Sequence, residues 1–232
     1  MVLMKKHKQV ENHWMSISDM MSALMIIFLF IAISFMIKVN EQKKDMDKII
    51  RESKQVKIEI YEALNKEFRD DFSQWGAELD QKTLSVRFKE PDVLFKPNSS
   101  RIEEKFIVIL DDFFPRYLKV LNNPKFKDFI QEVRIEGHTS SEWRDDLGTD
   151  IAYLENMRLS QERARSVLTY VFGLKLPEQR DWLIKHLTAN GLSFSQRIEN
   201  DGKENFEKSR RVEFRIRTNA DEKMTQLEDK TK

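Results

Sequence analysis

An apolar stretch near the N-terminus constrains this chain more than any other feature. Residues 20–37, MMSALMIIFLFIAISFMI, carry no charged side chain, and Asp19 is the only charged residue between Glu11 and Lys38. As a helix rising about 1.5 Å per residue, the run spans roughly 27 Å, which is enough for one bilayer crossing. A secretory signal would be shorter and would end in a small-residue cleavage site, and no such site follows the run. We therefore predict a retained transmembrane helix over residues 14–38.

The charges that flank this helix indicate its orientation. Three lysines, Lys5, Lys6 and Lys8, precede it, against a single acid, Glu11. Because lysine and arginine are enriched on the cytoplasmic side of membrane helices, we expect residues 1–13 to be a cytoplasmic tail. The bulk of the chain then lies beyond a bacterial inner membrane, in the periplasm, and the absence of cysteine is compatible with that oxidising compartment.

Asp19 is the residue of this segment that requires an explanation. A carboxylate at the centre of a membrane helix costs roughly 2.5–3.5 kcal/mol, and such acids usually face a bundle interior or a water path. One interpretation is a solvated acid at headgroup level or a helix N-cap, because Trp14 marks the interface about one turn away. The other is an acid that is buried against a partner and carries an ion. Ser18 and Ser22 are candidate neighbours of an ion path, although helix packing explains them equally simply. Since nothing else suggests a sodium site, we expect the ion to be a proton.

A polar segment with an apolar stripe follows the membrane helix. Residues 38–74 are about half charged and contain neither glycine nor proline. The apolar positions recur at steps of three, four or seven residues, which predicts a long amphipathic helix. They are Ile49, Val56, Ile60, Ala63, Leu64, Phe68, Phe72 and Trp75. We assign residues 39–78 to a helical connector that either dimerises as a parallel stalk or packs its stripe on the following domain.

The remaining sequence predicts one compact domain. Apolar patterns predict, in order, a strand at 84–88, a helix carrying Ile102 to Phe113 and interrupted by Pro115, a strand at 132–136, a helix at 159–172 and a strand at 211–217. Strands that alternate with helices indicate an α/β (α+β) domain over residues 79–218, with helices on one face of a mixed sheet. Residues 219–232 are polar and have little to bury, which predicts a disordered tail.

Composition excludes several classes of function. The 40 lysines and arginines against 39 acids give a net charge of +1, without the one-sided excess of a nucleic-acid binder. The chain has no cysteine for thiolate chemistry, and its six glycines form no phosphate-binding loop. Its four histidines lack metal-ligand spacing, and we expect His138 to be a turn residue that caps a strand end. We therefore expect no enzyme, no metal and no cofactor.

The middle of the chain resembles a known family. The stretch from Glu136 to Phe172, EGHTSSEW…NMRLSQERARSVLTYVF, resembles the OmpA-like peptidoglycan-binding domain, in which a G-H-T-D turn precedes N-x-x-L-S-x-x-R-A-x-x-V. The matching residues are Gly137, His138, Thr139, Asn156, Leu159, Ser160, Arg163, Ala164 and Val167. The later SRRVEFRI resembles the closing N-R-R-V-E strand of the family, with Ser209 in place of asparagine.

This resemblance implies a binding site. In the family, the arginine of L-S-x-x-R-A, here Arg163, recognises the free carboxylate of diaminopimelate in the peptide stem of peptidoglycan. A guanidinium offers a two-point match to a carboxylate. The family aspartate that meets the diaminopimelate amine is replaced by Ser140, and Glu142 is the candidate for the missing charge. The other binding positions that the resemblance implies are Thr139, Asn156 and Leu159, of which Leu159 equally suits the core.

The N-terminal segment resembles a second part of the same kind of protein. The stretch from Trp14 to Met25, WMSISDMMSALM, is similar to the transmembrane start of MotB-type stator subunits, in which one aspartate carries the ion. The short tail, the G-H-T-S variant and the size are most similar to the MotB-like subunits of Zorya anti-phage defence. The resemblance implies a 5:2 complex, in which a homodimer sits inside a ring of five MotA-like multi-helix partners. Asp19 would carry protons, and Arg163 would hold the chain to the cell wall.

Three other functions match parts of this pattern. A flagellar stator subunit has the same physics and differs in what the partner ring contacts. A passive peptidoglycan tether, with one anchor helix and no ion flux, predicts that Asp19 tolerates alanine. An energy transducer of the TolR or ExbD type shares the membrane acid but lacks the wall-binding motif.

Overall fold

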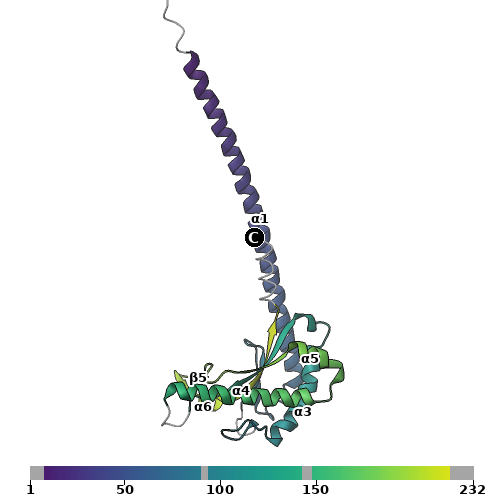
Figure 1. The fold of residues 1–232 in the computed structure, drawn as a ribbon. Coiled ribbons are helices and arrows are strands. Elements are labelled where there is room, and N and C mark those ends of the chain that lie inside the picture. Colours follow the sequence, from purple (N-terminus) through teal and green to yellow (C-terminus); the bar gives the residue numbers. More distant parts are fainter. Residues whose placement is uncertain (1–7, 90–93, 143–147, 220–232) are drawn as a thin grey trace, which may run out of the picture. The chain divides into compact units, whose positions relative to one another are not determined.

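The computed structural model describes residues 8–89, 94–142 and 148–219, with side chains from residue 17 onward (Figure 1). The chain divides into two compact units, residues 1–51 and residues 52–223, and each is described by itself. The expected disordered tail lies outside the described residues, apart from Asn219, and so does the basic part of the N-terminal tail before Lys8.

The first unit is helical throughout its described part. Helix α1 runs from Lys8 to Phe68, and it contains the whole apolar stretch without a break. Its most apolar window has a mean hydropathy of 2.7 and none of that window is buried. Among the described residues, this is the one helix that is long and apolar enough to cross a membrane. Such an exposed surface suits contact with lipid or with other apolar helices.

The second unit is built on a five-stranded sheet. Its strands are β1 (Ala77–Asp80), β2 (Ser85–Phe88), β3 (Ile130–His138), β4 (Leu187–Gly191) and β7 (Arg211–Thr218). They lie in the order β1-β2-β7-β3-β4, with β3 and β4 parallel and the other pairs antiparallel. The short strands β5 (Glu199–Asn200) and β6 (Lys203–Glu204) pair separately. The predicted mixed sheet is confirmed.

Besides the end of α1, the α-helices in the described part of this unit are α3 (Glu104–Leu121), α4 (Thr149–Gly173), α5 (Arg180–His186) and α6 (Phe206–Ser209). Aromatic side chains join α3 to the sheet, since the ring of Phe113 lies 5.2 Å from Phe88 and 5.1 Å from Phe214. Ala164 and Val167 of α4 belong to the same buried cluster. The opposite face of the strands carries charged residues. Helices therefore pack on the apolar face of the sheet, and the predicted OmpA-like fold class is confirmed.

The end of α1 belongs to this domain. Its buried residues from position 52 onward join the core of the second unit, and the ring of Phe68 lies 5.2 Å from that of Phe113. These α1 residues are Val56, Ile60, Leu64 and Phe68. The compact unit of the structure begins at Glu52, within α1, whereas the sequence pattern predicted a domain start at residue 79. Of the two interpretations of the stripe, packing on the domain is the one observed from Val56 onward.

Two helix boundaries also differ from the prediction. Helix α3 continues through Pro115. Proline lacks the N–H that would bond to the carbonyl of Asp111, but Asp111 is exposed, so water can bond to that carbonyl instead.

Helix α4 begins at Thr149 rather than at residue 159. Its first turns expose Ile151 and Leu154, so the sequence shows no continuous apolar stripe there.

Candidate functional site

A pocket of about 260 Å³ lies beyond the end of β3. Its walls come from the segment before α3, the segment after β3, one face of α4, and the residue before β7. The lining residues are Phe95, Pro97, Asn98, Thr139, Ser140, Glu142, Asn156, Leu159, Arg163 and Arg210. All six binding residues that the sequence resemblance implied are therefore brought together in one place.

Two glycines allow α4 to reach this position. A side-chain carbon on Gly137 of β3 would lie 2.3 Å from the backbone oxygen of Ser160. One on Gly191 of β4 would lie 2.3 Å from the backbone nitrogen of Gln161. Because only glycine leaves room for so close an approach, the helix backbone rests directly on the two parallel strands. Arg163, one turn further along α4, is thereby placed beside the strand end.

Arg163 is the central group of the pocket. Its side chain is 8% exposed, its Nε donates to the backbone oxygen of Ser99 at 2.9 Å, and its Nη2 donates to that of Lys96 at 3.3 Å. The guanidinium also lies 5.1 Å from the centre of the Phe95 ring. Burial, and secondarily the charge of Arg210, lowers the pKa of Arg163 to about 10. Within residues 8–89, 94–142 and 148–219, no carboxylate pairs with this buried cation, which lines the pocket.

Two other buried groups of the pocket also lack a partner. Neither Thr139 Oγ1 nor Asn156 Nδ2 makes a hydrogen bond within the described part of the chain. An unpaired buried polar group costs about 1–3 kcal/mol, and a ligand that pairs with these groups recovers that cost. Leu159 adds an apolar side chain to the lining of the pocket.

Glu142 and Arg210 form an ion pair at the same pocket. Arg210 Nη1 also lies 3.4 Å from Ser140 Oγ, which donates to Glu142 Oε2 at 3.4 Å. Glu142 is exposed, whereas Ser140 is buried. Arg210 is not among the binding residues that the sequence predicted. The signal was present, since Arg210 is the first arginine of the SRRVEFRI motif, which was assigned only to a strand.

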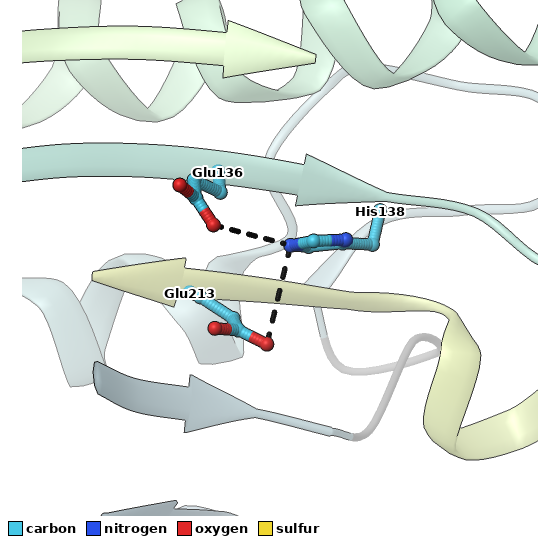
Figure 2. A group of neighbouring side chains, drawn as sticks. All are labelled: Glu136, His138 and Glu213. Carbon is cyan, nitrogen blue, oxygen red and sulfur yellow. Dashed lines mark ion pairs between the residues drawn. The ribbon is translucent and has the colours of Figure 1, made fainter. Parts of the chain in front are cut away.

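His138 is not the turn residue that the sequence suggested. It is the last residue of β3, its side chain is 1% exposed, and its Nε2 points toward two carboxylates (Figure 2). These are Glu136 Oε2 at 3.6 Å and Glu213 Oε1 at 4.0 Å. Burial lowers the pKa of His138, so its imidazole is neutral near pH 7.

A buried histidine between two carboxylates also has the composition of a metal site. Arginines, however, already compensate the acids. Glu213 Oε1 accepts from Arg211 Nε at 2.6 Å and from Arg87 Nε at 2.9 Å, and Arg215 Nη1 lies 3.6 Å from Glu136 Oε2. A divalent cation would meet these guanidiniums at close range. The cluster is therefore an ion-pair network on the polar face of the sheet.

The three membrane-segment residues singled out by sequence lie on α1, in the first unit. Ser22 Oγ donates to the backbone oxygen of Ser18 at 2.9 Å, one turn earlier in the same helix. This bond occupies the hydroxyl hydrogen of Ser22. Asp19 lies between the two serines in sequence and is exposed.

Comparisons with known proteins bear on the whole chain. No protein-family profile matches it. It is 45% identical to the Zorya protein ZorB of Escherichia coli strain Crooks over 218 aligned residues. The aligned residues cover 93% of this chain and 92% of that protein. A second Escherichia coli Zorya protein ZorB is 26% identical over 222 residues, with 88% and 79% covered. A solved MotB-like protein from Desulfovibrio vulgaris has a similar fold, with a TM-score of 0.50 and 22% identity over 72% of this chain and 98% of that one.

Proposed function

The chain belongs to the family of the Zorya protein ZorB, and from this membership we propose that it is the wall-anchored subunit of an ion-driven motor in the inner membrane. This is a MotB-like stator family of anti-phage defence and not a family of enzymes. The proposal assigns the wall anchor to the pocket of the second unit and the ion to Asp19 of the first.

The observation that carries the wall-anchor role is the buried guanidinium of Arg163, which has no carboxylate partner among the described residues. A buried arginine without an acidic partner is costly. Asn156 Nδ2, in the same pocket, is a second donor, and it has no acceptor in the part of the chain that the structure describes. Two such donors in one pocket suit a ligand carboxylate. We assign to them the free carboxylate of diaminopimelate in the peptide stem of peptidoglycan. Glu142 then receives the neighbouring ammonium, in place of the acid that Ser140 lacks.

The membrane part of the proposal concerns residues 1–51. Residues 1–13 form a cytoplasmic tail, residues 14–38 span the membrane, and the pocket-bearing domain is periplasmic. Two copies of the chain sit within a ring of five MotA-like partner subunits. Asp19 of each copy takes up and releases a proton, with Ser18 and Ser22 beside the path. A proton moving down the potential supplies about 2.3 kcal/mol per 100 mV, which drives the ring relative to the anchored chain.

Binding of the full-length protein, purified in detergent, to isolated peptidoglycan sacculi tests the wall-anchor role. Arg163→Gln should weaken binding about ten- to hundredfold, the loss of a charge-assisted hydrogen bond. Arg158→Gln is the matched control, because Arg158 lies on the same helix but pairs with the exposed acids Glu155 and Glu162. Equal binding by the Arg163 variant and the control would refute the anchor role.

A further inference from the structure

The charged side chains that the structure describes around the pocket do not balance. Three charged side chains of the described residues line it, namely Arg163, Arg210 and Glu142. The two guanidiniums are close enough that Arg210 depresses the pKa of Arg163. Among the described residues, the pocket walls therefore carry one positive charge more than they carry negative charges.

The position of the acid makes Arg210 available to a ligand. The family resemblance places an aspartate at position 140, where the side chain of this chain is a buried serine. The acid is instead Glu142, which is half exposed at 51% of its side-chain surface. An exposed ion pair contributes only about 0–1 kcal/mol. A ligand can therefore separate Glu142 from Arg210 at little cost.

We propose that Arg210 is a specificity-determining residue that binds a second carboxylate of the ligand, in addition to the one bound by Arg163. The ligand ammonium replaces Arg210 as the partner of Glu142, and the released guanidinium pairs with the second carboxylate. Two carboxylates and one ammonium carry a net charge of −1, which balances the excess of the pocket. A ligand with one carboxylate and one ammonium leaves that excess uncompensated.

The ligand class that follows is a stem peptide with two free carboxylates near its diaminopimelate ammonium. A stem in which one of the two is amidated or joined to a further residue should bind more weakly. This inference rests on the proposed wall-anchor function and adds a preference among the chemical forms of the wall peptide.

The probes are an N-acetylated stem tripeptide ending in diaminopimelate and the same peptide with each carboxylate in turn converted to a carboxamide. Their dissociation constants with the full-length protein in detergent are measured by calorimetry. Amidation of the carboxylate that binds Arg163 should weaken binding in every protein that retains that arginine. Amidation of the second carboxylate, the one that we assign to Arg210, should weaken binding of the peptide to the unmodified chain about tenfold or more.

The Arg210→Gln variant tests the assignment. Arg210→Gln should bind the parent peptide about tenfold more weakly than the unmodified chain does. The variant and the unmodified chain should bind the peptide whose second carboxylate is amidated with equal affinity. The preference for a free second carboxylate should thus disappear. Arg197→Gln is the control, because Arg197 contacts Glu204 outside the pocket at 3.9 Å, and it should keep the preference.

The outcomes separate this inference from the proposed function. If the parent peptide binds, and Arg163→Gln weakens it, while Arg210→Gln leaves the preference unchanged or lowers the affinity for all peptides equally, Arg210 does not read a second carboxylate. If the parent peptide does not bind the unmodified chain at all, the wall-anchor function itself is wrong.

Discussion

The carboxylates of Glu136 and Glu213 lie directly opposite each other on the antiparallel strands β3 and β7, and both residues are 2% exposed. Like charges in such cross-strand pairs are destabilising. The arrangement is tolerated because guanidiniums surround the pair. Arg87 and Arg211 bond to Glu213, and Arg215 approaches Glu136.

The two acids should therefore respond differently to neutralisation. Glu213→Gln leaves the buried Arg211 without its anionic partner and should lower the free energy of unfolding by about 3–5 kcal/mol. Glu136→Gln, the matched change across the strand pair, removes a like-charge contact and should cost much less. Urea denaturation of a soluble fragment spanning residues 52–219 measures both. If both variants lost the same free energy of unfolding, the arginines would not stabilise Glu213 more than Glu136.

Stability should depend on pH through His138. Because burial lowers the pKa of His138 in the folded chain below the ordinary value of 6.5, the unfolded chain binds more protons below that pH. Stability is then fully present above pH 6.5 and falls as the pH decreases, by at most about 1.4 kcal/mol per pH unit. His138→Gln should flatten this slope between pH 6.5 and 5. Denaturation midpoints at several pH values measure it, and an unchanged slope would contradict the assignment.

The close approach of α4 to the strands should not tolerate a methyl group. Gly137→Ala and Gly191→Ala each place a carbon 2.3 Å from helix backbone atoms, so the helix must shift. Each should cost about 1–3 kcal/mol or more and weaken binding of wall peptide by displacing Arg163. Gly173→Ala is the control at the end of the same helix, where nothing lies within 4 Å of the added carbon. It should be neutral or slightly stabilising.

The end of α1 should behave as part of the domain core. Leu64→Ala should cost about 2–5 kcal/mol, whereas Ile58→Ala, at an exposed site of the same helix, should have little effect. A fragment that begins at residue 79 should lose the cooperative unfolding transition that the fragment 52–219 shows. A stable fragment from residue 79 would restore the boundary that the sequence pattern suggested.

Substitution of Asp19 distinguishes an ion-driven motor subunit from a passive tether. Asp19→Asn should abolish protection against phage, because the amide cannot take up and release a proton, while the partner protein should still co-purify. Asp45→Asn, on the same helix beyond the apolar stretch, is the control and should keep protection. Plaque counts on cells that carry the complete defence system measure the effect. An active Asp19→Asn variant would exclude the ion-carrying role.

Much of the fold follows from sequence periodicity, and the elements that the sequence pattern did not predict have physical reasons for it. Val212, Phe214 and Ile216 alternate with charged residues, so β7 could be predicted directly. Strand β4, with the sequence LTANG, alternates only weakly, because its inward positions after Leu187 are the small residues Ala189 and Gly191, and Gly191 lies against a helix backbone. The sequence pattern could not show that the end of α1 packs on the domain, because a helix stripe looks the same whether it packs on a second helix or on a sheet.

The pocket was predictable by motif but its electrostatics were not. Sequence indicated Arg163 and Glu142, yet the partner of Glu142 is Arg210, which lies 68 positions away in the chain. His138 was misread for the same reason. A residue next to a turn motif gives no sign that its side chain is buried between Glu136 of its own strand and Glu213 of the neighbouring strand β7.

The hydrogen bonds of Arg163 to the carbonyls of Lys96 and Ser99 also bear on how long an anchor holds. A free arginine must lose side-chain entropy when it grips a carboxylate, about 0.5–1.5 kcal/mol. Here the hydrogen bonds to the pocket wall already fix the guanidinium in the folded chain. The side-chain entropy is therefore lost during folding and not on ligand binding. Dissociation must then break contacts without the gain of a newly mobile side chain. For a subunit that resists torque, the lifetime of the bond matters more than the speed of its formation.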